Sequence, residues 1–240
     1  MKPRLSNRKN NQPDPESAVS LNLTALDGSS IVDLKPEIVA IYRRWYTYLS
    51  REEPLPKRLG LISAVRGEGV TSVSLGLAAV MAADLEARIA LVECNWWAPG
   101  LAEAVHLAPA PGFSDLILGQ ASIEEVSRPC SLSNLVFFPS GQLPEVDRSR
   151  TARGAALLET LTNLNKEFDF LILDLPAILA VKDSPVLAGL SDALCLVIRQ
   201  GVTPIPVIKK ALDEVEHLHV RGVILNGVNI SLPKALTALL

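Results

Sequence analysis

Phosphate chemistry is the first possibility that the residue types in this chain raise. A glycine-rich segment directly follows the apolar run RLGLISA, and its members are Arg66, Gly67, Glu68, Gly69, Val70, Thr71 and Ser72. Glycines let successive backbone N–H groups close around phosphate oxygens where a helix begins. Thr71 occupies the position from which a hydroxyl ligates Mg²⁺ in such loops. The segment therefore predicts a phosphate-binding loop, with an ordinary tight strand-to-helix turn as the alternative.

The loop departs from the usual pattern at one position. Phosphate-binding loops end in Gly-Lys-Ser/Thr, whereas this segment has Val70 in place of the lysine. Valine offers neither a charge nor a donor, and losing one such electrostatic contact typically costs about 3–4 kcal/mol in a transition state. Arg66 is the nearby cation that would have to replace it.

A carboxylate ends another apolar run. Asp174 follows four apolar residues in FDFLILDLPA, which is the arrangement that holds Mg²⁺ directly or through water. We expect Thr71 and Asp174 to form the metal site together. The alternative is an aspartate that caps a loop, because aspartates are common at strand ends.

The elements that must position these residues alternate between strand and helix. Strands are expected at 58–64, 88–94, 134–141, 168–176, 192–201 and 221–228, and helices at 36–50, 71–86, 156–167, 183–190 and 204–219. Most of the strands are continuous Val/Ile/Leu runs, as in strands that are covered on both faces. The pattern predicts an α/β fold with a mostly parallel twisted sheet and helices on both faces. Ligands in such sheets bind beyond the carboxyl ends of the strands.

Composition narrows the class of protein further. The chain has 240 residues, of which 48% are hydrophobic and 20% charged, and a net charge of -3 argues against a general nucleic-acid binder. The three cysteines lack disulfide or zinc spacing.

We expect a flexible polar arm over residues 1–32 and a single domain over 33–240. Four basic groups in the first nine residues make the arm either a solvated tail or a contact for an anionic membrane surface.

Taken together, the segments resemble one family. The loop GEGVTS, IALVECNWWAPGL, PGFSDLILGQASIEEV, FDFLILDLPAILAVKDSPVLA and GVILNGV occur in an order that resembles the bacterial tyrosine kinases of capsule and exopolysaccharide synthesis, which belong with the MinD/ParA-type deviant P-loop ATPases. The resemblance covers about residues 36–230. It implies a P-loop NTPase-like fold, ATP and Mg²⁺ as ligands, and a cytoplasmic location at the inner face of the cell membrane. It also implies a membrane chain-length-control protein or a paralogous kinase as partner, and a homo-oligomer.

The resemblance assigns roles to further residues. Family members carry two aspartates around one residue where this chain has Glu93-Cys94-Asn95, so Glu93 is the expected catalytic carboxylate together with Asp174. Asn226 matches the residue that contacts adenine. Apart from the resemblance, the Trp96-Trp97 pair is either core packing or an exposed contact surface, and we favour the contact surface because the pair lies at a strand end.

Four departures from the family decide the favoured hypothesis. They are the missing lysine, the altered aspartate pair, an oligomerisation helix in which only Arg43 remains, and tyrosines confined to positions 42, 46 and 48. We expect a degenerate member that acts as a regulatory or scaffold partner in polysaccharide synthesis or export and binds nucleotide weakly or not at all. The alternatives are an active ATP-dependent tyrosine kinase that uses Arg66, and a MinD/ParA-like positioning ATPase.

Overall fold

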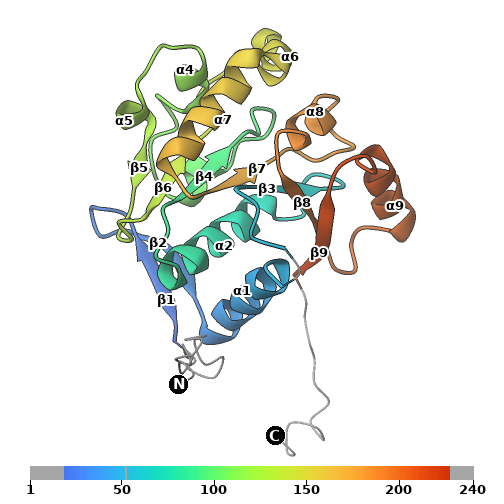
Figure 1. The fold of residues 1–240 in the computed structure, drawn as a ribbon, viewed down its shortest axis with the longest axis horizontal. Coiled ribbons are helices and arrows are strands. Elements are labelled where there is room, and N and C mark those ends of the chain that lie inside the picture. Colours follow the sequence, from blue (N-terminus) through green and yellow to red (C-terminus); the bar gives the residue numbers. More distant parts are fainter. Residues whose placement is uncertain (1–18, 52, 228–240) are drawn as a thin grey trace, which may run out of the picture.

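The computed structural model describes residues 19–51 and 53–227, which form a seven-stranded sheet between two layers of helices (Figure 1). The strand order is β5-β6-β4-β7-β3-β8-β9, and every pairing is parallel except the one between β5 and β6. The strands are β3 (Arg58–Ser63), β4 (Ile89–Glu93), β5 (Arg128–Pro129), β6 (Leu135–Phe138), β7 (Phe170–Asp174), β8 (Ala193–Arg199) and β9 (Val220–Asn226). The predicted α/β class and mostly parallel sheet are confirmed.

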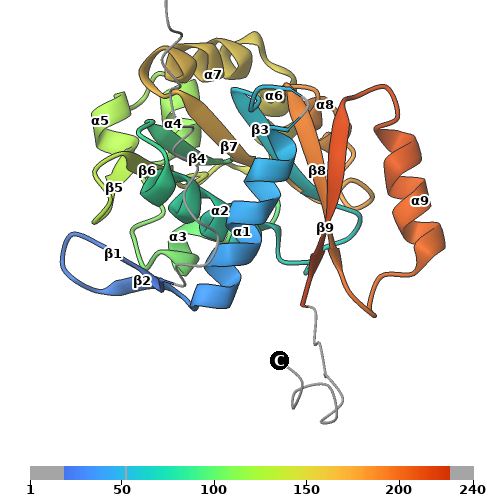
Figure 2. The same ribbon diagram turned by 60° about the horizontal axis from the view of Figure 1, so that its bottom comes forward.

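Helices cover both faces of the sheet, as the apolar strands predicted. One face carries α1 (Pro36–Leu49), α2 (Val70–Asp84) and the short α3 (Leu101–Ala104). The other carries α4 (Phe113–Ile117), α5 (Ile123–Val126), α6 (Glu145–Arg153), α7 (Ala155–Glu167), α8 (Ser184–Ala188) and α9 (Ile205–Glu214). Figure 2 shows α1 and α2 on the opposite side of the sheet from α7. Among the described residues, no helix is long and apolar enough to cross a membrane.

The central helix α2 has an apolar surface all round, because it is enclosed between the sheet and α1. Eleven of its fifteen residues are buried. Gly76 lies under the ring of Tyr42, and a Cβ there would come within 2.6 Å of that ring, so only glycine permits this approach of α1. The close fit fixes the first turn of α2, and therefore the loop that precedes it, relative to the sheet.

The prediction of a flexible arm over residues 1–32 is wrong for the last third of that segment. Residues 21–34 form an antiparallel hairpin of β1 (Leu21–Thr24) and β2 (Ser30–Leu34) around a turn in which Gly28 has a φ of 85°. Leu23, Ala25 and Ile31 are buried in the same core as α1 and α2, so apolar burial holds the hairpin on the domain (Figure 1). The folded domain therefore begins before residue 33. Residues 1–18 of the arm lie outside the described part of the chain.

Candidate functional site

The predicted phosphate loop connects β3 to α2 and has the backbone conformation that glycine permits. Gly67 and Gly69 have φ values of 82° and 88°, which residues with a Cβ rarely adopt. A Cβ on Gly67 would meet nothing within 4 Å, so this side of the loop is open. The loop thus presents backbone at the beginning of a fifteen-residue helix, as a phosphate cradle requires.

A cavity of about 180 Å³ lies at the carboxyl ends of the strands beside this loop. Its lining unites most of the predicted site, namely Ser63, Arg66, Gly67, Glu68, Gly69, Val70, Thr71, Asn95, Ala98, Asp174, Leu175 and Ala177. Three of the predicted residues are not part of this lining: Ser72, Glu93 and Asn226. Ser72 is exposed on the first turn of α2.

Asp174 supplies the unpaired charge of the cavity. It ends β7, is fully buried, and neither carboxylate oxygen has a hydrogen-bond partner within residues 19–51 and 53–227. Burial, and after it the neighbouring carboxylate of Glu93, raise the pKa of Asp174 to about 7, whereas the nearby hydroxyl of Thr71 acts to lower it. A buried carboxylate without a partner is costly unless a cation or a proton neutralises it.

Glu93 has a different environment, although it is paired with Asp174 in the register of β4 and β7. Its Oε1 accepts hydrogen bonds from the backbone N–H groups of Gly100 (2.6 Å) and Leu101 (2.8 Å). Its Oε2 accepts one from the N–H of Ser140 (2.9 Å). The carboxylate therefore anchors the beginning of α3 to the end of β6, and a catalytic role for Glu93 stays a prediction that this geometry disfavours.

Asn95 lies in the cavity wall, and its amide is also engaged. Its Oδ1 accepts from the N–H of Ala98, and its Nδ2 donates to the carbonyl of Ala98.

The prediction that the tryptophan pair forms a contact surface is wrong for Trp96. This residue is 2% exposed and donates its Nε1–H to the carbonyl of Ser140. Trp97 is half-buried and packs against the same core. Apolar burial and the Ser140 hydrogen bond thus draw the pair inward.

Val70, at the lysine position, is the first residue of α2. Its side chain is 9% exposed and belongs to the core formed with α1 and α2. Arg66 is exposed and is the only basic residue that lines the cavity among those the structure describes. The cavity therefore has no basic side chain at the usual lysine position. The long side chain of Arg66 lies at its rim instead.

Arg43 and Asp183 both form hydrogen bonds within the domain. Arg43 forms a two-bond ion pair with Asp84 at the end of α2, at 2.8 and 2.7 Å, and Tyr46 donates its hydroxyl to the same carboxylate. Asp183 accepts hydrogen bonds from Ser149 and from Arg153 of α6. Arg43 thus ties α1 to α2, and Asp183 ties α6 to the beginning of α8.

Sequence reasoning missed the connections that hold the loop. The carboxylate of Glu68 is buried and bonds to Val65, Arg199 and Thr203, and Asn226 donates its Nδ2–H to the carbonyl of Glu68. Glu68 and Asn226 were predicted to bind nucleotide. In the structure, both side chains brace the loop. The sequence did not indicate this, because Arg199, Thr203 and Asn226 are all distant from Glu68 in the chain.

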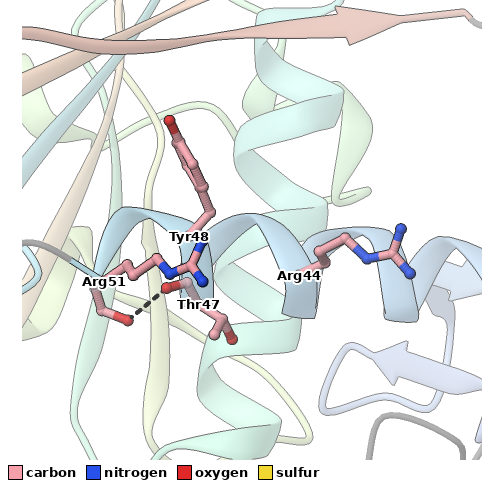
Figure 3. Close-up of a pocket in the computed structure, with 5 residues that line it drawn as sticks. Arg44, Thr47, Tyr48 and Arg51 are labelled. Atoms are coloured by element: carbon pink, nitrogen blue, oxygen red, sulfur yellow. Dashed lines mark hydrogen bonds between the residues drawn. The ribbon is translucent and has the colours of Figure 1, made fainter.

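A larger hollow, of about 520 Å³, lies on the outer face of α1 (Figure 3). It is lined by Arg44, Thr47, Tyr48, Ser50 and Arg51, which all come from one helix end. Figure 3 shows the labelled side chains spread along the helix rather than converging on one point. We place the candidate site in the smaller cavity, because it joins the ends of several strands and contains the unpaired Asp174.

The cavity fits a magnesium ion better than it fits a complete phosphate-transfer centre. Asp174 and Thr71 would hold Mg²⁺, and the open loop backbone would face phosphate oxygens. No group of three or more His, Cys, Asp or Glu side chains that could hold a metal occurs in the described residues. A bound Mg²⁺ would therefore take its remaining ligands from phosphate and water.

Comparisons with known proteins agree with this geometry. The chain is 26% identical over 162 residues to the tyrosine-protein kinase Wzc of Salmonella typhimurium, and 25% identical over 177 residues to the succinoglycan biosynthesis transport protein ExoP of Rhizobium meliloti. These matches cover 67% and 72% of this chain but only 22% of each relative. The tyrosine-protein kinase YwqD of Bacillus subtilis is 26% identical over 177 residues, which cover 73% of this chain and 74% of YwqD. No family model matches the chain.

Superposition on solved structures agrees with the sequence comparisons. The kinase domain of VpsO superposes with a TM-score of 0.72 and 26% identity, covering 80% of this chain and 95% of that domain. The cell-division ATPase MinD of Pyrococcus furiosus superposes with a TM-score of 0.59 at 20% identity, over 75% of this chain and 77% of MinD, which is a likeness of fold alone. The chain is thus a homologue of the bacterial tyrosine kinases, with the P-loop NTPase fold that their kinase domains share with MinD-like ATPases.

Proposed function

We propose that this chain is a degenerate tyrosine-kinase-type domain that binds Mg-nucleotide weakly and transfers no phosphoryl group. The observation that carries the proposal is the state of Glu93, whose two carboxylate oxygens already accept three backbone N–H groups. These donors occupy three of the roughly four lone-pair sites of the carboxylate, and Glu93 does not line the cavity. The neighbouring acid position is Asn95, which carries no charge and is bonded to Ala98. The cavity also contains the carboxylate of Asp174, and with Asp174 assigned to Mg²⁺ neither Glu93 nor Asn95 is placed to receive the acceptor proton.

The missing lysine supports the same conclusion. Phosphoryl transfer depends on cations that neutralise charge on the transferring group. Val70 supplies none, and its side chain packs in the core. What remains, the glycine loop with Thr71 and Asp174, is the part of the site that binds Mg²⁺ and phosphate. Binding without transfer is the function that these remaining residues favour.

The relatives support a proposal for the cellular role. ExoP is named for succinoglycan biosynthesis and transport, and the chain matches only 22% of its length. We propose that this chain acts in exopolysaccharide or capsule biosynthesis or export, at the inner face of the cell membrane, as a regulatory or scaffold partner. Its partner is a membrane chain-length-control protein or a paralogous active kinase. Longer relatives that join such a domain to other segments support an association of this kind.

Titration calorimetry with Mg-ATP tests the proposal. The wild type is expected to bind weakly, and Val70→Lys to bind at least about tenfold more tightly, because the lysine restores a contact that P-loop proteins use for the β- and γ-phosphates. Val146→Lys is the matched control, since Val146 is 88% exposed on α6 and gains the same charge away from the cavity. Tight binding by the wild type, with transfer of the γ-phosphate to tyrosine, contradicts the proposal.

A second candidate is an active kinase in which Arg66 replaces the lysine. The observation that favours it is the position of Arg66, which is exposed and lines the cavity. Arg66→Ala separates the two candidates, because it abolishes phosphate transfer only in the second.

A further inference from the structure

Glu68 stands out among the residues of the loop because its side chain is buried. It lies between two glycines with positive φ, in an otherwise exposed turn, and is 2% exposed. A carboxylate is removed from water at high cost unless hydrogen bonds replace its hydration. The position of Glu68 therefore depends on its partners, which the structure identifies.

The partners come from two separate parts of the chain. Oε2 accepts from the backbone N–H of Val65, in the loop itself, at 2.9 Å. Oε1 accepts from the backbone N–H of Arg199, at 3.2 Å, and from the hydroxyl of Thr203. Arg199 ends β8, and Thr203 lies in the connection between β8 and α9. One carboxylate thus joins the phosphate loop to the connection formed by residues 199–204.

A second tie runs from β9. The Nδ2–H of Asn226 donates to the carbonyl of Glu68 at 2.8 Å, and the Oδ1 of Asn226 accepts from the N–H of Gly227. A Cβ on Gly69 would come within 2.2 Å of that Nδ2, so the glycine makes room for the asparagine. The loop is therefore bonded to the carboxyl ends of both strands beyond β3 in the sheet, β8 and β9.

We infer that Glu68 is a positioning residue that couples the conformation of the phosphate loop to the 199–204 connection. Hydrogen bonds to a charged group are stronger than neutral ones, and here three donors share one carboxylate. Opening the connection removes two donors from Glu68 and loosens the loop, and a ligand that orders the loop orders the connection in turn. The ligand part of this inference rests on the proposed binding of Mg-nucleotide; the coupling itself does not.

Hydrogen–deuterium exchange on the full chain tests the coupling, with substitutions made at Thr203 and exchange read at the amides of Val65 and Arg199. Thr203→Val removes only the hydroxyl and keeps the branched shape. It is expected to speed exchange of both amides by roughly tenfold, because one of three hydrogen bonds to the carboxylate is lost. Thr203→Ser restores the hydroxyl and is expected to exchange like the wild type. Thr160→Val is the matched control, because the Thr160 hydroxyl donates to the carbonyl of Ala156 within α7, away from the loop.

The outcomes separate the coupling from the proposed function. Faster exchange in Thr203→Val at both amides, reversed in Thr203→Ser, supports the coupling. Unchanged exchange at Val65, or a Thr203→Ser protein that behaves like Thr203→Val, overturns it. Mg-ADP is then added to the wild type and is expected to protect Val65 and Arg199 together. Coupling that persists while Mg-ADP protects neither amide contradicts nucleotide binding and leaves the coupling intact.

Discussion

Glu93 and Asp174 lie opposite each other in the parallel register of β4 and β7, yet of the two carboxylates only that of Glu93 has hydrogen-bond partners among the described residues. The longer side chain of Glu93 reaches the N–H groups of Gly100, Leu101 and Ser140. Asp174 ends beside the cavity with both oxygens unpaired in the part of the chain that the structure describes. One carboxylate thus stabilises the fold, and the other makes a site for a cation or a proton.

Glu93→Gln is expected to lower the free energy of unfolding by about 2–3 kcal/mol. The amide keeps one acceptor oxygen but places an NH₂ group against one of the backbone donors, which loses its partner in a buried setting. Urea unfolding measures the change. Glu103→Gln is the control, because Glu103 is exposed on α3, and it is expected to change stability by less than about 0.5 kcal/mol. If Glu93→Gln leaves the free energy of unfolding unchanged but abolishes phosphate transfer, the result supports a catalytic role for Glu93.

Asp174 is expected to make the free energy of unfolding decrease as the pH rises. Its folded pKa of about 7 lies above its ordinary value of 3.8, so between these values the folded state binds more protons than the unfolded state. Stability therefore falls as the pH rises from about 4 to 7, by at most roughly 4 kcal/mol at about 1.4 kcal/mol per pKa unit. Urea unfolding between pH 4 and 8 measures the slope.

Two variants and one ion test this assignment. Asp174→Asn removes the titrating group and is expected to flatten the slope and to be more stable than the wild type at pH 8. Asp213→Asn, at an exposed position on α9, is expected to keep the wild-type slope. Millimolar Mg²⁺ is expected to stabilise the wild type at pH 8 and to leave Asp174→Asn unchanged. An equal response of both proteins to Mg²⁺ places the ion elsewhere.

The main elements were predictable from the sequence because their signals are local. The expected helix at 36–50 is Pro36–Leu49, and the expected strand at 168–176 is Phe170–Asp174. Proline at the beginning of a helix and a continuous apolar run bounded by polar residues act within the segment itself. The missed hairpin had its own signal, the pair Asp27-Gly28 between alternating apolar residues, which is typical of a tight turn.

The roles of side chains in the site were not predictable, because their partners are distant in the chain. Glu93 bonds to Ser140, 47 residues away, and Glu68 bonds to Thr203, 135 residues away. Nothing near Trp96 in the sequence indicates that its indole N–H donates to the carbonyl of Ser140. Residue type and position at a strand end identified the region of the fold that holds the site. The order of the strands in the sheet decides which of these side chains find hydrogen-bond partners.

Arg66→Ala is expected to change the affinity for Mg-ATP by less than about threefold. The side chain is exposed at the rim of the cavity, where an interaction with phosphate is screened by water and salt. Calorimetry at two salt concentrations measures it, with Arg44→Ala as the control for loss of one positive charge. A loss of tenfold or more that is specific to Arg66→Ala supports the active-kinase alternative, because it gives Arg66 the role of the missing lysine.

Arg43→Ala is expected to lower the free energy of unfolding by about 2–3 kcal/mol and to leave the oligomeric state unchanged. Asp84, whose side chain is 8% exposed, loses both hydrogen bonds to the guanidinium and keeps the one from the hydroxyl of Tyr46. Arg44→Ala, on the exposed face of the same helix, is the control and is expected to change stability by less than about 0.5 kcal/mol (Figure 3). Urea unfolding and sedimentation velocity measure the two properties. An Arg43→Ala protein of normal stability whose sedimentation changes contradicts the internal role, because it shows that the guanidinium acts between subunits rather than between α1 and α2.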